Sequence, residues 1–448
     1  MDRIRPIPAL AFPAPEDGDL SSRIAPPYDV LDESSKQALL DRDSQNIVKV
    51  DLPHLPPKTV GPDETYEAAG EQFQQWIDEG VLEARPAAYY VYEQQYEVDG
   101  ESYARRGLIA NVRVQPFGDS PVGEGGVYPH EETFSSPKED RLKLMRATEA
   151  QLSPIFGLYS DPDQAIGGRI AAATEGDPTF TGVTDNDGVE HRLWAVEDAD
   201  AMAALSDQLQ SAAIFIADGH HRYTTAINYR DELADAEGIG PDHPAEWCMF
   251  VLVAMEDPGM VVLPTHRVLG SMSDFSVAAL QEAAAGALEI QPADVADLAE
   301  LEASLPDHGP HAMGLYTPGD ESGTFWIATT VSDDPLAADH GEQCDAWRQL
   351  DVAILQHLVV EKICEPTFSD GASVDWKFPH DLDQVEAIAD GEKYPLGVIL
   401  QPTPLEAVKA VSEAGQRMPQ KSTFFYPKVA TGFAINPLAP RHHPEAGS

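Results

Sequence analysis

The junction between residues 212 and 237 constrains the fold of this chain more than any other segment. The short, bounded, apolar run at 212–217 has the length and composition of a buried strand. Asp218 and Gly219 break the run, and a helical pattern then extends from near His220 to about Glu237. The sequence therefore predicts a sheet strand followed at once by a helix, whose first N–H groups have no partner within the helix.

The residues of this junction have the chemistry of an anion site, because a helix start attracts phosphate through its dipole and its N–H groups. Gly219 allows the sharp turn, and Arg222 can hold a phosphate through two contacts. His220 and His221 can donate hydrogen bonds or move a proton. Asp218 can bind Mg²⁺ or accept a proton. The alternative is a capped helix with surface histidines.

The rest of the chain mixes helical and strand patterns, which predicts an α+β fold. Asp99-Gly100 and Asp187-Gly188 are expected turns of two hairpins. The proline-rich residues 1–30 are expected to run extended over the surface, with a rigid turn at 25–30. Helices are expected at 63–80, 198–210, 346–361 and 404–416, and strands at 47–50, 88–97, 103–115, 247–255, 259–268, 394–401 and 430–435.

Few structural signals occur between residues 285 and 310, where alanine, aspartate and proline are common. We expect a domain boundary there. The predicted organisation is an N-terminal domain at 1–285 that carries the junction, a C-terminal mixed α/β domain at 286–436, and a disordered tail at 437–448.

A second polar segment begins with His130 and Glu131 and continues to Lys138 and Arg141. Lys138 and Arg141 are three residues apart at a predicted helix start, so they can clamp one anion. His130 and Glu131 lack metal-ligand spacing, and Glu131 is only a candidate catalytic carboxylate. The alternative is an ion-paired surface loop.

Two further segments combine basic and polar residues. His266 and Arg267 follow a predicted strand end, while Lys421 and Lys428 flank the aromatic residues 424–426. The aromatic residues are expected to fill the core, but packing does not explain the lysines. Lys421 is taken as a candidate phosphate-binding residue, and His266, Arg267 and Lys428 as further candidates.

The chain carries 76 acidic and 29 basic residues, a formal charge of −47 spread along its length. Concentrated salt would screen the self-repulsion of such a surface, so we interpret the charge as adaptation to a high-salt (halophilic) cytoplasm. The alternative is an acidic protein with a basic partner. No apolar run is long enough to span a membrane, and no secretory core follows the N-terminal charges.

Several familiar signals are absent from the sequence. The three cysteines form no CxxC pair, which argues against disulfides and a structural zinc site, and no metal site is predicted. The sequence also lacks GxxxxGK[ST], GxGxxG after a strand, HExxH and GxSxG, so P-loop, Rossmann and α/β-hydrolase chemistry are not expected.

Seven segments, in order, resemble the family known as domain of unknown function 1015, over about residues 3–435. They are Arg3–Pro6, Pro26–Val30, Pro129–Glu131, Asp140–Arg141, Ala217–Tyr223, Pro264–Arg267 and Met418–Thr423.

The DGHHR element at 218–222 also resembles the phosphate-binding turn of the ParB/sulfiredoxin-like superfamily, which includes CTP-binding partition proteins and free serine kinases. The resemblance implies a ParB/sulfiredoxin-like core that binds phosphate at this turn. Histidine replaces the sulfiredoxin cysteine, which excludes sulfiredoxin chemistry.

We expect from this resemblance a phosphotransferase or phosphatase that acts on a small hydroxylated metabolite, with serine and phosphoserine as the favoured pair and ATP or ADP with Mg²⁺ as cofactor. The expected partner is a phosphorylated metabolite or nucleotide. The alternatives are a non-catalytic nucleotide or metabolite sensor and a ParB-like DNA-binding protein. The chain has no basic stripe for DNA.

Overall fold

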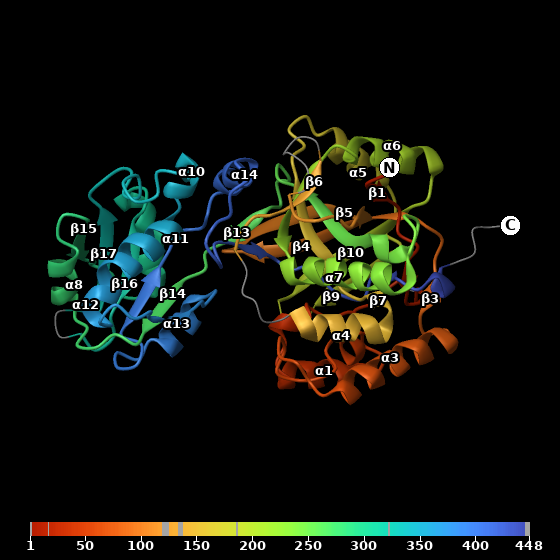
Figure 1. Ribbon diagram of the computed structural model, residues 1–448, viewed down its shortest axis with the longest axis horizontal. Helices are drawn as coiled ribbons and strands as arrows, with labels where there is room; N and C mark the ends of the chain where they lie inside the picture. Colours follow the sequence, from red (N-terminus) through yellow and green to blue (C-terminus); the bar gives the residue numbers. More distant parts are fainter. Residues whose placement is uncertain are drawn as a thin grey trace. The chain divides into compact units, whose positions relative to one another are not determined.

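A computed structural model describes residues 2–16, 18–118, 125–132, 138–184, 187–320 and 323–443, with only the backbone described at Lys138. The chain divides into two compact units. Unit 1 comprises 1–129, 133–261 and 427–448, and unit 2 comprises 130–132 and 262–426. The secondary structure is mixed, as expected for an α+β protein (Figure 1). Within the described ranges, each helix is too short or too polar to cross a membrane.

Unit 1 is built on a nine-stranded mixed sheet with the order β6-β11-β8-β12-β5-β4-β10-β9, and β1 pairs with β5. The β11 strand lies inside this sheet, parallel to β6 and antiparallel to β8. Its position confirms the prediction of a buried strand at 212–217. The strands are β1 (Ile4–Arg5), β4 (Tyr89–Val98), β5 (Glu101–Arg113), β6 (Gly126–Pro129), β8 (Ile155–Tyr159), β9 (Phe180–Thr184), β10 (Val189–Val196), β11 (Ala213–Asp218) and β12 (Trp247–Ala254).

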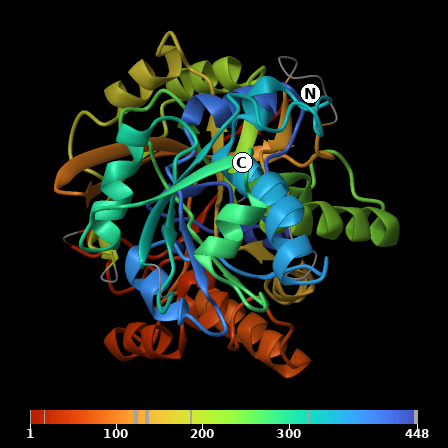
Figure 2. The ribbon, with the colours of Figure 1, turned by 90° about the vertical axis from the view of Figure 1, so that its left-hand side faces the viewer.

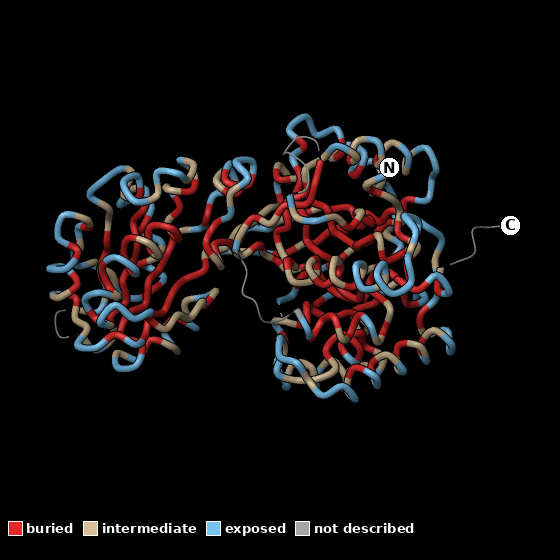
Figure 3. Tube along the Cα trace, in the orientation of Figure 1, coloured by how far each residue is buried: buried red, intermediate tan, exposed pale blue. Residues whose placement is uncertain are grey.

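Helices cover this sheet, and buried residues of its strands form much of the core of unit 1. Figure 3 colours the Cα trace by burial and shows the buried stretches in red. The α4 helix packs against both α3 and α7, and Figure 1 shows these three helices side by side. The helices are α1 (Glu33–Arg42), α2 (Val48–Asp51), α3 (Asp63–Asp78), α4 (Lys138–Thr148), α5 (Ala165–Ala173), α6 (Ala199–Leu209) and α7 (His220–Glu237), with the 3-10 turns η1 (Tyr28–Val30), η2 (Pro244–Glu246) and η5 (Pro440–His442). Two short sheets pair β2 (Leu10–Ala11) with β3 (Glu83–Ala84) and β7 (Ala150–Gln151) with β21 (Asn436–Pro437).

Unit 2 contains a six-stranded antiparallel sheet with the order β15-β17-β16-β19-β14-β18. Figure 2 shows the ribbon from a second direction. Its strands are β14 (Arg267–Gly270), β15 (Leu288–Pro292), β16 (Met313–Tyr316), β17 (Phe325–Thr330), β18 (Asp375–Lys377) and β19 (Leu396–Ile399). Its helices are α8 (Val277–Ala283), α9 (Leu298–Ser304), η3 (Leu305–His308), α10 (Asp345–Arg348), α11 (Asp351–Ile354), the π-helix η4 (Leu355–Cys364), α12 (Glu365–Phe368), α13 (Leu382–Ile388) and α14 (Leu405–Glu413). A separate ribbon pairs β13 (Val261–Leu263) with β20 (Phe424–Tyr426).

The predicted strand at 47–50 is wrong, because this segment enters the helix α2. Asn46 explains the difference. Its side-chain amide donates to the carbonyls of Ser22 (2.9 Å) and Ile24 (2.7 Å), and its Oδ1 accepts from the Val48 N–H at 2.9 Å. This capping starts a helical turn and overrides the strand preference of the valines.

The N-terminal segment does not run over the surface as predicted. Ile4, Ile7, Leu10 and Phe12 are all buried, because β1 and β2 pair with strands of unit 1. The expected strand at 430–435 is also wrong, since only isolated bridges form there, at Thr431 and at 435.

The structure divides the chain at 261/262, whereas the sequence suggested 285/286. The reason is that two elements before residue 285 belong to unit 2: β14 is part of its sheet, and α8 packs against β15 and η4. The sequence assigned residues 437–443 to a disordered tail. The structure instead shows an ordered segment there, in which Leu438 and Ala439 are buried. Residues 444–448 lie outside the described residues.

Candidate functional site

Gly219 links β11 to α7 and fixes the geometry of the candidate site. Its φ of +99° lies in the left-handed region that favours glycine. A Cβ atom at this position would lie 3.0 Å from Nε of Arg222. Glycine is therefore required twice, for the turn and for the close approach of the arginine.

The start of α7 differs from the starts of α1 and α6. Asp32 and Asp198 cap those two helices by accepting hydrogen bonds from backbone N–H groups. At α7 the N-cap is Gly219, and among the described residues no N-cap side chain accepts from the helix. The first turn of α7 also contains no acidic residue, and the nearest carboxylate in sequence is that of Asp218, one residue before the N-cap.

Asp218 lies between two cations at this helix start. Its Oδ1 pairs with Nζ of Lys428 at 3.1 Å, and its Oδ2 accepts from Nη2 of Arg222. Nη1 of Arg222 donates to the carbonyl of Pro154. The side chains of Asp218, Lys428 and Arg222 are 22%, 17% and 11% exposed. The side chains of Arg222 and Lys428 are thus held in place by Asp218 while remaining partly exposed to solvent.

A second acidic residue influences the same cations. Asp29 pairs with Nζ of Lys58 at 3.1 Å. Burial alone would raise the pKa of Asp29, but Lys58, Arg222 and Lys428 outweigh both burial and the repulsion from Asp218 and hold this pKa below its usual value. Asp29 is therefore a carboxylate at neutral pH.

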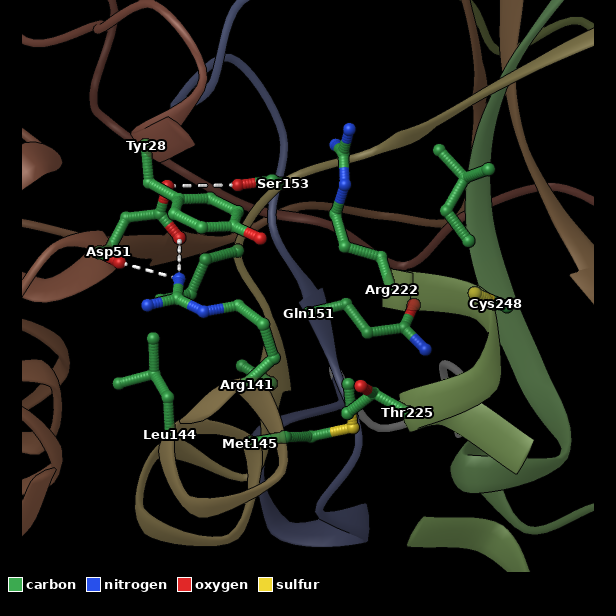
Figure 4. A pocket seen from close by; sticks show the side chains of 13 residues that line it. Tyr28, Asp51, Arg141, Leu144, Met145, Gln151, Ser153, Arg222, Thr225 and Cys248 are labelled. Carbon is green, nitrogen blue, oxygen red and sulfur yellow. Dashed lines mark hydrogen bonds and ion pairs between the residues drawn. The ribbon is translucent and has the colours of Figure 1, made fainter. Parts of the chain in front are cut away.

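A small pocket of about 40 Å³ lies beside Arg222. Figure 4 shows Tyr28, Asp51, Arg141 and Ser153 grouped on one side of it and Arg222 on the other. The guanidinium of Arg141 lies 3.9 Å from the centre of the Tyr28 ring and donates to the Asp51 carbonyl at 2.7 Å. Ser153 Oγ donates to Asp51 Oδ2 at 3.0 Å. Burial raises the pKa of Asp51, although Arg141 acts in the opposite direction.

The sequence-predicted residues divide between the two units. Unit 1 contains Asp218, Gly219, His220, His221, Arg222, Arg141 and Lys428, whereas unit 2 contains His130, Glu131, His266, Arg267 and Lys421. The side chain of Lys138 lies outside the described residues. Arg141 does not stand on an exposed helix face as the clamp predicted, because it is buried and pairs with Asp140 at 2.8 Å.

The predicted residues of unit 2 form a cluster of their own. His130 Nε2 lies 2.8 Å from Thr423 Oγ1. Arg267 is buried and donates to the carbonyl of Lys421 at 2.9 Å, and burial lowers its pKa to about 9. His266 Nδ1 accepts from a backbone N–H, and its Nε2 lies 3.4 Å from Glu302. These contacts tie the 418–423 loop to the sheet of unit 2.

Sequence reasoning missed Asp29, Asp51, Lys58 and Ser153. The Pro26–Val30 segment was noted as a turn and as one of the family segments, but no role was assigned to Asp29 within it. Asp51 was overlooked because its neighbours resembled a strand. Over the part of the chain that the structure describes, no three histidine, cysteine or acidic side chains gather as a metal site.

Comparisons with known proteins place this chain in a family and give weaker structural likenesses. The family model described as protein of unknown function (DUF1015) matches residues 4–353. No curated protein matches the sequence.

Three solved structures are similar over much of their length. Free serine kinase in complex with AMP has 12% identity and a TM-score of 0.31, covering 71% of this chain and 96% of that chain. A conserved hypothetical protein from Pyrococcus furiosus has 12% identity and a TM-score of 0.31, covering 71% and 98%. C-terminally truncated SbnI from Staphylococcus aureus has 9% identity and a TM-score of 0.34, covering 73% and 87%.

Proposed function

This chain belongs to the family of proteins of unknown function DUF1015, and for this member we propose that the start of α7 binds phosphate and supports phosphoryl transfer. The donor would be ATP or ADP, or a phosphate ester in the reverse direction. The other substrate would be a small hydroxylated metabolite, with serine and phosphoserine as the favoured pair. A ParB/sulfiredoxin-like core for unit 1 is part of this proposal.

The observation that carries the proposal is the position of Arg222 and Lys428 at the α7 start, where both pair with Asp218. Phosphoryl transfer requires little covalent chemistry from the protein, because positioning and neutralisation of the phosphate oxygens supply most of the catalysis. Two cations held in place beside a helix dipole meet that requirement. They are oriented before a ligand arrives, so little reorganisation is needed.

The remaining junction residues would have the following roles. Asp218 would orient the cations and, with the phosphates of the nucleotide, bind Mg²⁺, which usually takes only one or two carboxylates from a protein. His220 and His221 would donate hydrogen bonds or move a proton. Glu131 remains a candidate catalytic carboxylate, although it belongs to unit 2 and α7 belongs to unit 1.

The test is a transfer assay on the full chain in 2 M KCl. Protein, Mg²⁺ and ATP or ADP are incubated with serine or phosphoserine, and both directions are followed by chromatography. Lys428→Gln is expected to lower kcat/KM at least tenfold. Lys362→Gln removes a lysine that pairs with Asp339 in unit 2, and it should change kcat/KM less than twofold.

If the protein transfers phosphate neither to serine nor from phosphoserine, the serine proposal is wrong. If nucleotide binding persists without turnover, the non-catalytic sensor becomes the better description of this site.

A further inference from the structure

Lys428 reaches the α7 start from an irregular segment of unit 1. Residues 427–430, which follow β20, belong to neither a helix nor a strand. They lack the ladder of hydrogen bonds that fixes a strand, so their polar backbone groups need other partners. Val429 and Ala430 are 1% and 5% exposed, so solvent reaches this segment poorly. The groups that bind its backbone therefore decide where Lys428 lies.

Two side chains of the unit 1 sheet bind this segment. Gln94 on β4 and Arg105 on β5 are directly opposite each other in the antiparallel register, so their side chains share one face of the sheet. Nη2 of Arg105 donates to the carbonyl of Pro427 and to Oε1 of Gln94. Nε2 of Gln94 donates to the carbonyl of Lys428 at 2.9 Å. The two side chains thus hold the carbonyls of consecutive residues, and one of these residues is Lys428 itself.

Arg105 is held in turn by the strands that carry the candidate site. It is 1% exposed, and its guanidinium lies 4.6 Å from the centre of the Phe156 ring. Phe156 on β8 is the residue opposite Asp218 on β11. Burial lowers the pKa of Arg105, so a guanidinium at this position is costly. Its rigid fork suits the two acceptors that it meets, and the stack on Phe156 ties the Lys428 segment to the strand pair of Asp218.

We propose that Arg105 and Gln94 are positioning residues for phosphate binding, because they fix the backbone from which Lys428 reaches Asp218. Lys428 has a flexible four-carbon side chain, so a movement of its backbone would let the ammonium group leave the helix start. Both residues act through Lys428. This inference rests on the proposed function, since it explains how one of the two cations is held before a ligand arrives.

The first experiment follows Lys428 without a ligand. The full chain in 2 M KCl is treated with acetic anhydride, and the acetylation rate of each lysine is measured by mass spectrometry. Arg105→Met and Gln94→Met should each raise the rate at Lys428 at least threefold. The rate at Lys143 should change less than twofold. Lys143 is the internal standard, because it also belongs to unit 1, pairs with Asp63 at 2.6 Å and has a side chain that is 24% exposed.

A merely structural role would loosen unit 1 as a whole and raise both rates together. The matched control is Arg106→Gln. Arg106 follows Arg105 on β5 but points to the opposite face of the sheet, where it pairs with Glu93 at 2.6 Å. This variant should leave both rates unchanged. If Arg105→Met does not fold, Gln94→Met tests the same contact.

The second experiment is a double-mutant cycle with Lys428→Gln, read as pyrophosphate affinity by calorimetric titration in 2 M KCl. Arg105→Met should weaken pyrophosphate binding at least threefold in the otherwise unmodified chain. In the Lys428→Gln chain the same substitution should change the affinity less than twofold, because its effect passes through the lysine.

The positioning role is overturned if the acetylation rate at Lys428 is unchanged in the variants, or if the rate at Lys143 rises equally. It is also overturned if Arg105→Met weakens pyrophosphate binding equally with and without Lys428. Failure of the proposed function is read separately, as absence of pyrophosphate binding in the unmodified chain. The acetylation rates would then still decide whether Arg105 and Gln94 position the lysine.

Discussion

Replacement of Arg222 by alanine tests the phosphate site most directly. Within the described residues, two of the five guanidinium donors are engaged, one by Pro154 and one by Asp218. Three N–H groups therefore remain for a ligand. Two charge-assisted hydrogen bonds to phosphate, at about 1.5–3 kcal/mol each, correspond to at least roughly 3 kcal/mol in total, which is at least about a hundredfold in affinity.

Calorimetric titration with pyrophosphate in 2 M KCl measures this loss. The Debye length is about 3 Å at 1 M salt, so screening removes long-range attraction but leaves direct hydrogen bonds largely intact. The matched control is Arg230→Ala on the same helix. Arg230 pairs with Asp231 and is 16% exposed, but it lies nearly three turns beyond the α7 start. Its loss should change pyrophosphate affinity less than twofold.

A pyrophosphate dissociation constant for Arg222→Ala within twofold of the unmodified chain would refute the assignment of phosphate to this helix start. Equal losses in both arginine variants would refute it as well, because the effect would then reflect general charge. Circular dichroism establishes that each variant remains folded.

Three further predictions concern the turn, a buried histidine and the surface charge. Gly219→Ala should destabilise the fold by about 1–3 kcal/mol and weaken pyrophosphate binding. Gly238→Ala is the control, because Gly238 also has positive φ but lies in open space at the other end of α7; this variant should lose about 1 kcal/mol of stability and leave binding unchanged. Equal pyrophosphate binding in the two variants would contradict the role of Gly219. Burial lowers the pKa of His191 to about 3. As the pH falls from 6.5 to 3, this histidine takes up a proton in the unfolded chain but not in the folded one. The free energy of unfolding, measured by denaturant titration, should therefore fall by a few kcal/mol over this pH range. His191→Asn should reduce that part of the acid sensitivity, and an unchanged pH profile would argue against it. The melting temperature should rise by about 10 °C or more between 0.1 and 2 M KCl, because salt screens a net charge of −47, and an equal rise in sucrose would show that screening is not the cause.

The sequence predicted local elements well wherever one residue type controls the backbone. Asp99 and Gly100 both have positive φ in the β4–β5 hairpin, and α7 begins at His220 as expected from the Gly219 break. The resemblance to the DUF1015 family was also confirmed.

Long-range pairing explains what the sequence could not predict. The helix at Val48 depends on hydrogen bonds from Asn46 to residues more than twenty positions earlier. The pairing of Asp218 with Lys428 joins residues 210 positions apart, and periodicity carries no signal for such a contact. Lys428 was selected only because it flanks the aromatic residues 424–426 and packing did not explain its presence there.

The position of Lys428 has a consequence for how the protein is made. Unit 1 receives its last segment, from residue 427 onward, only after the whole of residues 262–426 has been synthesised. On a ribosome that adds about 5–20 residues per second, the β11–α7 junction therefore exists for many seconds before its lysine leaves the exit tunnel. During that interval Asp218 can pair with Arg222 alone, so the nascent chain acquires its two-cation site only after residues 262–426 have been synthesised.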